Sequence, residues 1–264
     1  MGLDIYSILN GVTSGNALVP ARDPGAVTGS AFIQNNLDLT GNAREQNILG
    51  EFEHGNIPDF LRNFVPVTVT SAVGTITYLV TSDVLCLGSN EDYVRMPMTP
   101  LTAQAIANQY DCTLPTRKIA NDIWAAAPNK LTPLPWGPPF DGDMLKTYRI
   151  GVHNSRIQAQ LNGMNAQALI TGHKKDVVLT NKLAPNNPNQ RVAIYGWIQP
   201  SGQPIQGLNP VSHEVTYADY SHGIRLIAND VMINNQAGRI TDVFSDPTLC
   251  SLISDEGPLT FYHN

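Results

Sequence analysis

The sequence predicts an α+β protein, in which an N-terminal arm and a mixed, helix-containing half pack on a β-rich C-terminal half. Three observations favour this class. Residues 1–42 are rich in Gly, Asn, Ala and Thr, the stretch to residue 140 mixes helix starts with a hairpin pattern, and the remainder holds β-branched runs between Asn/Pro turns. At 264 residues the chain is long enough to bury a sizeable core.

The first 42 residues are expected to form an extended arm that wraps a neighbouring subunit or the chain's own body. Residues 43–140 are expected to form a helical and hairpin subdomain, because capping residues, first-turn prolines and alternating β-branched residues follow one another there. The predicted elements are helices at 43–52 and 57–64, a hairpin of 66–70 and 75–80, a strand at 84–87, and helices at 99–110 and 115–127.

Residues 141–264 are expected to form a β-rich domain that carries the candidate site. Its strands are predicted at 145–153, 176–181 and 191–197, between turns rich in Asn and Pro. The preceding segment, 128–143, contains too many prolines and glycines for regular structure. We expect this Pro-rich segment to be a linker or one wall of a cleft.

Composition excludes several classes of partner. The formal net charge of -6 and the pI near 5.4 argue against nucleic acid, whose affinity depends largely on Lys and Arg. No stretch reaches membrane-spanning length, and the chain as given begins without the basic and apolar regions of a signal peptide. Only 14% of residues are charged, which is common in extracellular and virion proteins and predicts one of these locations.

Histidines and their polar neighbours concentrate between positions 173 and 222, and imidazole is the side chain best suited to move protons near neutral pH. The strongest cluster is 213–225. Within it we expect His222 or His213 to act as general base, Asp219 as its orienting partner, and Ser221 as nucleophile or hydrogen-bond donor. In an extended strand Ser221 and His222 face opposite sides, so a histidine from another segment is the freer partner for Ser221.

Substrate contacts are assigned to the guanidinium and aromatic groups around this cluster. Arg225 is expected to bind a substrate carboxylate, and the other expected contacts are Trp197, Tyr217 and Tyr220. A metal is an alternative, with His173 and Asp176 as the candidate ligands, but no cofactor is required for the proposed chemistry. A hydrogen-bonded network that ties loops to a sheet is an equally good interpretation of the same residues.

Two strings in this region resemble the paired signature of the L,D-transpeptidase catalytic domain. They are Gly202-Gln203-Pro204-Ile205-Gln206-Gly207 and Ser221-His222-Gly223-Ile224-Arg225-Leu226. The resemblance implies a β-rich fold in which Ser221, His222, Gly223 and Arg225 line an acyl site for peptidoglycan stems. The family's nucleophilic cysteine has no counterpart between Gly223 and Ile224, and Gln206 replaces its upstream histidine, so the resemblance implies a location without the covalent mechanism.

The whole chain also resembles an uncharacterised group of bacterial secreted proteins, to which no activity is attached. The residues that carry this resemblance are Pro58-Asp59-Phe60-Leu61-Arg62, Leu114-Pro115-Thr116-Arg117-Lys118 and His173-Lys174-Lys175-Asp176-Val177-Val178.

The leading functional interpretation is a hydrolase of a bacterial cell-envelope or extracellular polymer, with a glycan or peptide substrate. It rests on the clustering of titratable groups in one half of a chain that is otherwise poor in charge. The alternative is a non-catalytic structural or binding protein of a virion or secreted assembly, in which the N-terminal arm forms a homo-oligomer.

Overall fold

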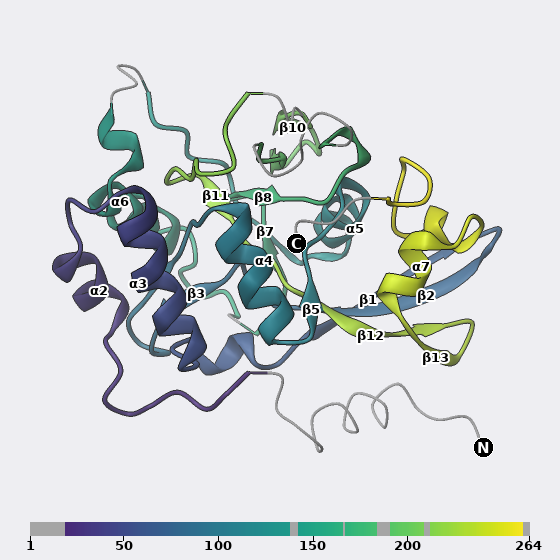
Figure 1. Ribbon diagram of the computed structural model, residues 1–264, viewed down its shortest axis with the longest axis horizontal. Coiled ribbons are helices and arrows are strands. Elements are labelled where there is room, and N and C mark those ends of the chain that lie inside the picture. Colours follow the sequence, from purple (N-terminus) through teal and green to yellow (C-terminus); the bar gives the residue numbers. More distant parts are fainter. Residues whose placement is uncertain (1–18, 138–141, 166, 184–190, 209–211, 261–264) are drawn as a thin grey trace.

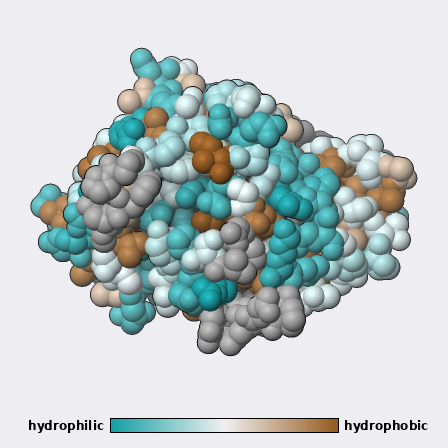
Figure 2. Space-filling view, turned by 90° about the horizontal axis from the view of Figure 1, so that it is seen from above, coloured by the Kyte–Doolittle hydropathy of each residue, from teal (hydrophilic) through white to brown (hydrophobic). Residues whose placement is uncertain are grey.

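The structure is a computed structural model that describes residues 19–137, 142–165, 167–183, 191–208 and 212–260 (Figure 1). Helices and several small sheets are both present, which confirms the α+β class. No helix in these ranges is long and apolar enough to cross a membrane. Figure 2 shows one face on which apolar residues form small patches separated by hydrophilic ones.

The elements follow one another in short pieces along the chain. The helices are α2 (Gly29–Asn35), α3 (Gly41–Glu53), α4 (Pro100–Gln109), α5 (Arg117–Ala126), α6 (Thr147–Gln158) and α7 (Ile240–Ser245). Short 3₁₀ helices cover η1 (Asp59–Leu61), η2 (Gly142–Leu145), η3 (Asn181–Leu183) and η5 (Leu249–Leu252). The strands are β1 (Val65–Ser71), β2 (Gly74–Val80), β3 (Cys86–Gly88), β4 (Tyr93–Arg95), β5 (Cys112–Thr113), β6 (Asn129–Lys130), β7 (Ile170–Thr171), β8 (Lys175–Val177), β9 (Ile194–Ile198), β10 (Pro204–Gln206), β11 (His222–Gly223), β12 (Ile227–Ile233) and β13 (Gln236–Arg239).

The larger sheet joins the two predicted parts of the chain. Its order is β1-β2-β12-β13, and β5 also pairs with β12. Strand β12 lies beyond residue 140 but pairs antiparallel with β2, with Ile227 opposite Val80 and Val231 opposite Tyr78. A boundary at residue 140 therefore does not separate two independently packed units, because this sheet and the main core are built from both sides of it.

The smaller sheet carries the residues that the sequence singles out. Its order is β10-β9-β8-β11. Strand β11 is parallel to β8, and this register places His222 beside Lys175 and Gly223 beside Asp176. A Cβ at Gly223 would lie 2.7 Å from Cβ of Lys174 and 2.7 Å from Cγ1 of Val84, so only glycine fits between them.

Several predicted elements are confirmed with small changes in their ends. Strands β1 and β2 form the expected hairpin, and the helices expected after positions 99 and 115 are α4 and α5. The Thr99 side chain accepts a hydrogen bond from the N–H of Thr102, and that of Thr116 accepts one from the N–H of Ile119, as N-caps do. The helix expected at 57–64 shrinks to the 3₁₀ turn η1.

Other predictions are wrong, and packing explains why. Most of the strand expected at 145–153 is instead the start of α6, whose buried side chains include Ile150, His153, Asn154 and Ile157. Their spacing is helical, so the β-branched residues that suggested a strand pack on the core through one face of a helix. The expected arm at 1–42 contains helix α2 and the start of α3, while residues 1–18 lie outside the described residues.

Candidate functional site

Asp219 is the centre of the polar cluster. Its Oδ1 accepts hydrogen bonds from the backbone N–H and the hydroxyl of Ser221, at 2.8 and 2.6 Å, and its Oδ2 accepts one from the hydroxyl of Tyr217 at 2.8 Å. The N–H of His222 donates to the carbonyl of Asp219 at 3.2 Å. This is the turn that an aspartate in the first position favours, because its side chain bonds the backbone two residues on.

The neighbours of Asp219 stabilise the charged form of its carboxylate. Burial alone raises its pKa, but His222, Lys175 and the bonds from Ser221 outweigh burial and hold the pKa well below the usual range. His222 is neutral at pH 7. At that pH, Lys175 and the hydrogen bonds from Ser221 are therefore the groups that stabilise the Asp219 carboxylate. Asp219 is therefore a buried carboxylate that accepts hydrogen bonds from Ser221 and Tyr217. It makes no described hydrogen bond to a histidine ring, so its expected role as the orienting partner of a histidine is corrected.

Ser221 and His222 do not form a catalytic pair. Both are 0% exposed, and the Ser221 hydroxyl donates to Asp219. Neither ring nitrogen of His222 has a hydrogen-bond partner in the described part of the chain, and burial lowers its pKa to about 4. The expected role of Ser221 as a nucleophile beside a histidine is therefore corrected, since its hydroxyl bonds Asp219 and no hydrogen bond joins it to a described histidine.

His213 and Tyr217 are the two members of the cluster that are only half-buried. Their rings stack with centroids 4.0 Å apart and planes 6° from parallel, and Tyr217 also meets the ring of His222 edge-on at 5.7 Å. Burial and the Asp219 carboxylate raise the pKa of Tyr217, and burial lowers the pKa of His213.

A cavity of about 380 Å³ lies against this stacked pair. We call it the 213–217 cavity; its walls come from residues Thr40, Gly41, Arg44, Leu145, Ser212, His213, Glu214, Thr216, Tyr217 and Ala218. Its volume falls within the range of roughly 300–1,000 Å³ that is typical of small-ligand sites. The buried guanidinium of Arg44 is tied to the carbonyl oxygens of Ala218 and Leu145.

Arg225 supports the backbone and does not reach a substrate. It is 2% exposed, and its two Nη atoms donate to the carbonyl oxygens of Thr81 and Ile170, each at 2.7 Å. The side chain thereby joins the end of β2 to β7. The expectation that Arg225 binds a substrate carboxylate is therefore corrected.

Tyr220 and Trp197 are enclosed in an aromatic cluster. The Tyr220 ring meets His153 at 4.8 Å and Trp136 at 5.7 Å, and its hydroxyl accepts a hydrogen bond from the N–H of Trp136 at 2.7 Å. Trp197 donates through Nε1 to the carbonyl of His173. Tyr220 and Trp197 are 3% and 4% exposed, and Trp136 of the Pro-rich segment packs on Tyr220, so the expected contact of both residues with substrate is corrected.

The two candidate metal ligands differ in burial and in hydrogen-bond partners. Nε2 of His173 lies 2.9 Å from Oδ1 of Asp83, whose Oδ2 also binds Arg95, in a fully buried network. Asp176 is half-buried, and burial raises its pKa to about 6. Within the described ranges no three His, Cys, Asp or Glu side chains are grouped so that they could hold a metal ion.

Lys174 was not singled out from the sequence, although it lies directly between His173 and Lys175. Its Nζ donates to the carbonyl of Tyr220 at 2.5 Å and lies 3.2 Å from Nδ1 of His153. Burial, and then the charge of Arg95, lower its pKa to about 7. The buried partners His153, Asp83 and Arg95 were also missed, because each comes from a distant segment and none stands in a recognisable motif.

Lys174 makes stability depend on pH in a defined direction. Because its pKa is about 7 in the folded chain and about 10.4 in an unfolded one, the unfolded state binds more protons between these values. The free energy of unfolding should therefore rise with pH across this window. Urea denaturation at several pH values should show a smaller rise for Lys174→Met than for the wild type, and an unchanged rise for Lys146→Met, at a partly exposed position, would exclude a general effect of losing a lysine.

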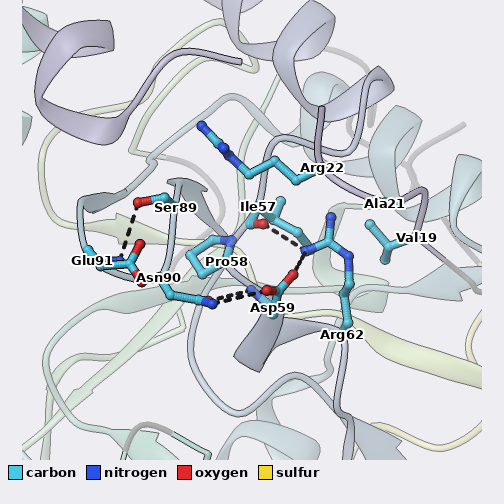
Figure 3. Close-up of a pocket in the computed structure, with 10 residues that line it drawn as sticks. All are labelled: Val19, Ala21, Arg22, Ile57, Pro58, Asp59, Arg62, Ser89, Asn90 and Glu91. Carbon is cyan, nitrogen blue, oxygen red and sulfur yellow. Dashed lines mark hydrogen bonds and ion pairs between the residues drawn. The ribbon is translucent and has the colours of Figure 1, made fainter. Parts of the chain in front are cut away.

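A second cavity, of about 430 Å³, lies at the start of the described chain (Figure 3). In Figure 3 the side chain of Asp59 lies between those of Arg62 and Asn90 and accepts a hydrogen bond from each, at 3.1 and 3.0 Å. Arg62 also donates to the carbonyl oxygens of Pro20 and Gly55. These polar groups fasten the segment at Pro20 to the body of the protein, so we do not assign a ligand to this cavity.

No protein-family model, curated protein or solved structure matches this chain. The two strings that resemble the L,D-transpeptidase signature lie in β10 and β11, at opposite edges of the smaller sheet, with β9 and β8 between them. The features of this chain that indicate a function are the 213–217 cavity and the polar cluster of Tyr217, Asp219, Ser221 and His222 beside it.

Proposed function

We propose that this chain is a non-catalytic binding protein of a secreted or virion assembly, and that it recognises a neutral glycan strand of an extracellular or cell-envelope polymer. The observation that carries this proposal is the stacked pair of His213 and Tyr217 at the wall of the 213–217 cavity. Flat rings pack well against the C–H face of a pyranose, and amphipathic aromatic residues are common in binding sites.

The remaining walls of the cavity fit a neutral, hydroxyl-rich ligand. Thr40, Ser212 and Thr216 supply hydroxyl groups, and Glu214 supplies a carboxylate. The guanidinium of Arg44 is paired with the Glu45 carboxylate at 3.4 Å and also donates to two backbone carbonyl oxygens, so its charge is already balanced and the described lining residues offer no other Lys or Arg for an anionic ligand. The nearby charge of Asp219 and the net charge of -6 also disfavour an anion.

Calorimetric titration with two soluble oligosaccharides, chitotetraose and cellotetraose, tests the proposal. We expect at least one to bind, and Tyr217→Ala to weaken its Kd by about tenfold or more, since about 1.4 kcal/mol of aromatic contact is lost. Tyr148→Ala is the matched control, because Tyr148 is also half-buried but lines a different cavity. No binding at millimolar concentration, or equal binding by Tyr217→Ala, would contradict the proposal.

Hydrolysis of such a polymer is the second candidate, and one observation favours it. The pKa values of Lys174 and Asp176, about 7 and about 6, allow proton exchange near neutral pH, and such groups gather at active sites. Mass spectrometry of the oligosaccharide recovered from the titration separates the two candidates. Intact oligosaccharide supports binding alone, whereas shortened products that disappear in Asp176→Asn, a position outside the cavity wall, support hydrolysis.

Self-association through residues 1–42 stays a prediction, and residues 1–18 of that arm lie outside the described residues. It agrees with an assembly protein, because the part of the arm before Thr40, the first residue that lines the 213–217 cavity, can contact a neighbouring subunit.

A further inference from the structure

Tyr217 separates the 213–217 cavity from a second set of polar groups. Tyr217 lines the cavity, its ring meets the ring of His222 in an edge-to-face contact, and its hydroxyl donates to Oδ2 of Asp219. Asp219 and His222 are 8% and 0% exposed and do not line the cavity themselves. Movement of this one side chain would therefore connect them to the cavity.

His222 is the group whose environment needs an explanation. A neutral imidazole has one N–H donor and one acceptor nitrogen, and the described residues provide a partner for neither. Burying such a group without partners costs free energy, so an orphaned ring beside a cavity is a mark of an incomplete site. The charged and titratable groups that act on His222 are Asp219, Lys175, His213 and Lys174, and Asp219 is the carboxylate that the Tyr217 hydroxyl binds.

Resting on the proposed function, we propose that Asp219 and His222 form a subsite for one sugar hydroxyl, and that the Tyr217 hydroxyl holds this place when no ligand is bound. The phenol shows what the carboxylate accepts, namely one neutral hydroxyl donor at 2.8 Å. A sugar hydroxyl can donate to Oδ2 of Asp219 and accept from the N–H of His222 at the same time. An anion is disfavoured by the carboxylate of Asp219.

A sugar hydroxyl can replace the Tyr217 hydroxyl without rearrangement of the surrounding turn. A slide of the Tyr217 ring along the ring of His213 keeps the stack and breaks only the hydrogen bond to Asp219. The surrounding turn keeps its own anchors, because the N–H of Val192 donates to the carbonyl of His213 at 3.2 Å and Arg191 pairs with Glu214 at 2.6 Å. The bonds from Ser221 to Oδ1 also remain, so Asp219 keeps its orientation while Oδ2 becomes free.

Chemical labelling of His222 tests this opening without a ligand. Diethylpyrocarbonate acylates neutral imidazole, and tandem mass spectrometry of the peptide that contains both His213 and His222 gives the two rates together. We expect Tyr217→Phe, which keeps the ring and loses the bond to Asp219, to label His222 about tenfold faster than wild type, as expected for loss of one charge-assisted hydrogen bond. His213 is the internal reference and Tyr148→Phe the matched control.

An unchanged His222 rate in folded Tyr217→Phe, verified by its thermal melting curve, would overturn the subsite. Labelling of Tyr217→Phe with and without saturating chitotetraose or cellotetraose then tests occupancy, and we expect the ligand to protect His222. If an oligosaccharide binds by calorimetry but leaves the His222 rate unchanged, the subsite is wrong and the proposed function stands. If neither oligosaccharide binds, the proposed function fails, and the assignment to a sugar hydroxyl fails with it even where Tyr217→Phe accelerates labelling.

Discussion

Asp83→Asn is expected to lower the free energy of unfolding by about 3–5 kcal/mol, because it leaves a buried arginine without its counter-ion. Asp83 and Arg95 are both 0% exposed, and Oδ2 of Asp83 accepts from Nη2 and Nε of Arg95 at 2.6 and 2.9 Å. Burial alone raises the pKa of Asp83, but Arg95 and His173 outweigh it and hold that pKa well below the usual range. The carboxylate is thus charged wherever the protein is folded at neutral pH.

Urea denaturation of Asp83→Asn measures this loss, and a paired replacement identifies its origin. Asp83→Leu combined with Arg95→Met removes both charges and leaves neither one unpaired, so we expect it to destabilise less than Asp83→Asn alone. A double variant that is as unstable as the single one would show that packing at these positions, and not the unpaired charge, sets the loss.

Asp219→Ala has the second largest expected effect, a loss of about 2–4 kcal/mol in the free energy of unfolding. It removes the acceptor of three hydrogen bonds, leaving the N–H and hydroxyl of Ser221 and the hydroxyl of Tyr217 without their partner. Ser221→Ala is the matched control, because it removes a single side-chain bond from the same carboxylate and should cost about 1 kcal/mol.

The same variant should alter the response to acid. Since the folded-state pKa of Asp219 lies below its unfolded value of about 3.9, its contribution to stability is present above that value and is lost as pH falls through the folded pKa. Between neutral pH and pH 3, the wild type should therefore lose more stability than Asp219→Ala. Denaturant midpoints that fall in parallel for both proteins would contradict this role for Asp219.

Some elements could be predicted because neighbouring residues in the sequence are sufficient to specify them. Thr99 before Pro100 specifies a helix start, and the alternating threonines on both sides of Gly74 specify a hairpin, so α4, β1 and β2 were predicted. Helix α6 was not, because its valine and isoleucines are compatible with a strand until the core that buries Ile150 and Ile157 is known. Burial is set by distant segments and overrides such local preferences.

The candidate site was located from the sequence, but its roles could not be assigned. Strand alternation predicted that Ser221 lies on the side of Asp219 and away from His222; the side chains of Ser221 and Asp219 do bond, but through a turn at 219–222 and not through an extended strand. Whether His222 is exposed, or which oxygen accepts from Tyr217, depends on how residues 212–222 fold back on β8. The role of Arg225 could not be predicted for the same reason. A guanidinium can bind a carboxylate, but here it donates to two backbone carbonyl oxygens from other segments.

The pairing of β12 with β2 has a consequence for synthesis on the ribosome. Strand β2 is synthesised directly after its partner β1, but the strand that pairs with its other edge, β12, comes much later. Ile227, the first residue of β12, follows Val80 by about 150 residues. At ordinary elongation rates this separation corresponds to a delay on the order of 10 s. During this interval the nascent chain exposes an open strand edge beside apolar side chains such as Ile76 and Tyr78, which are 0% exposed in the finished fold. Nascent chains that stop before β12 should therefore depend on chaperones more than the full-length protein does.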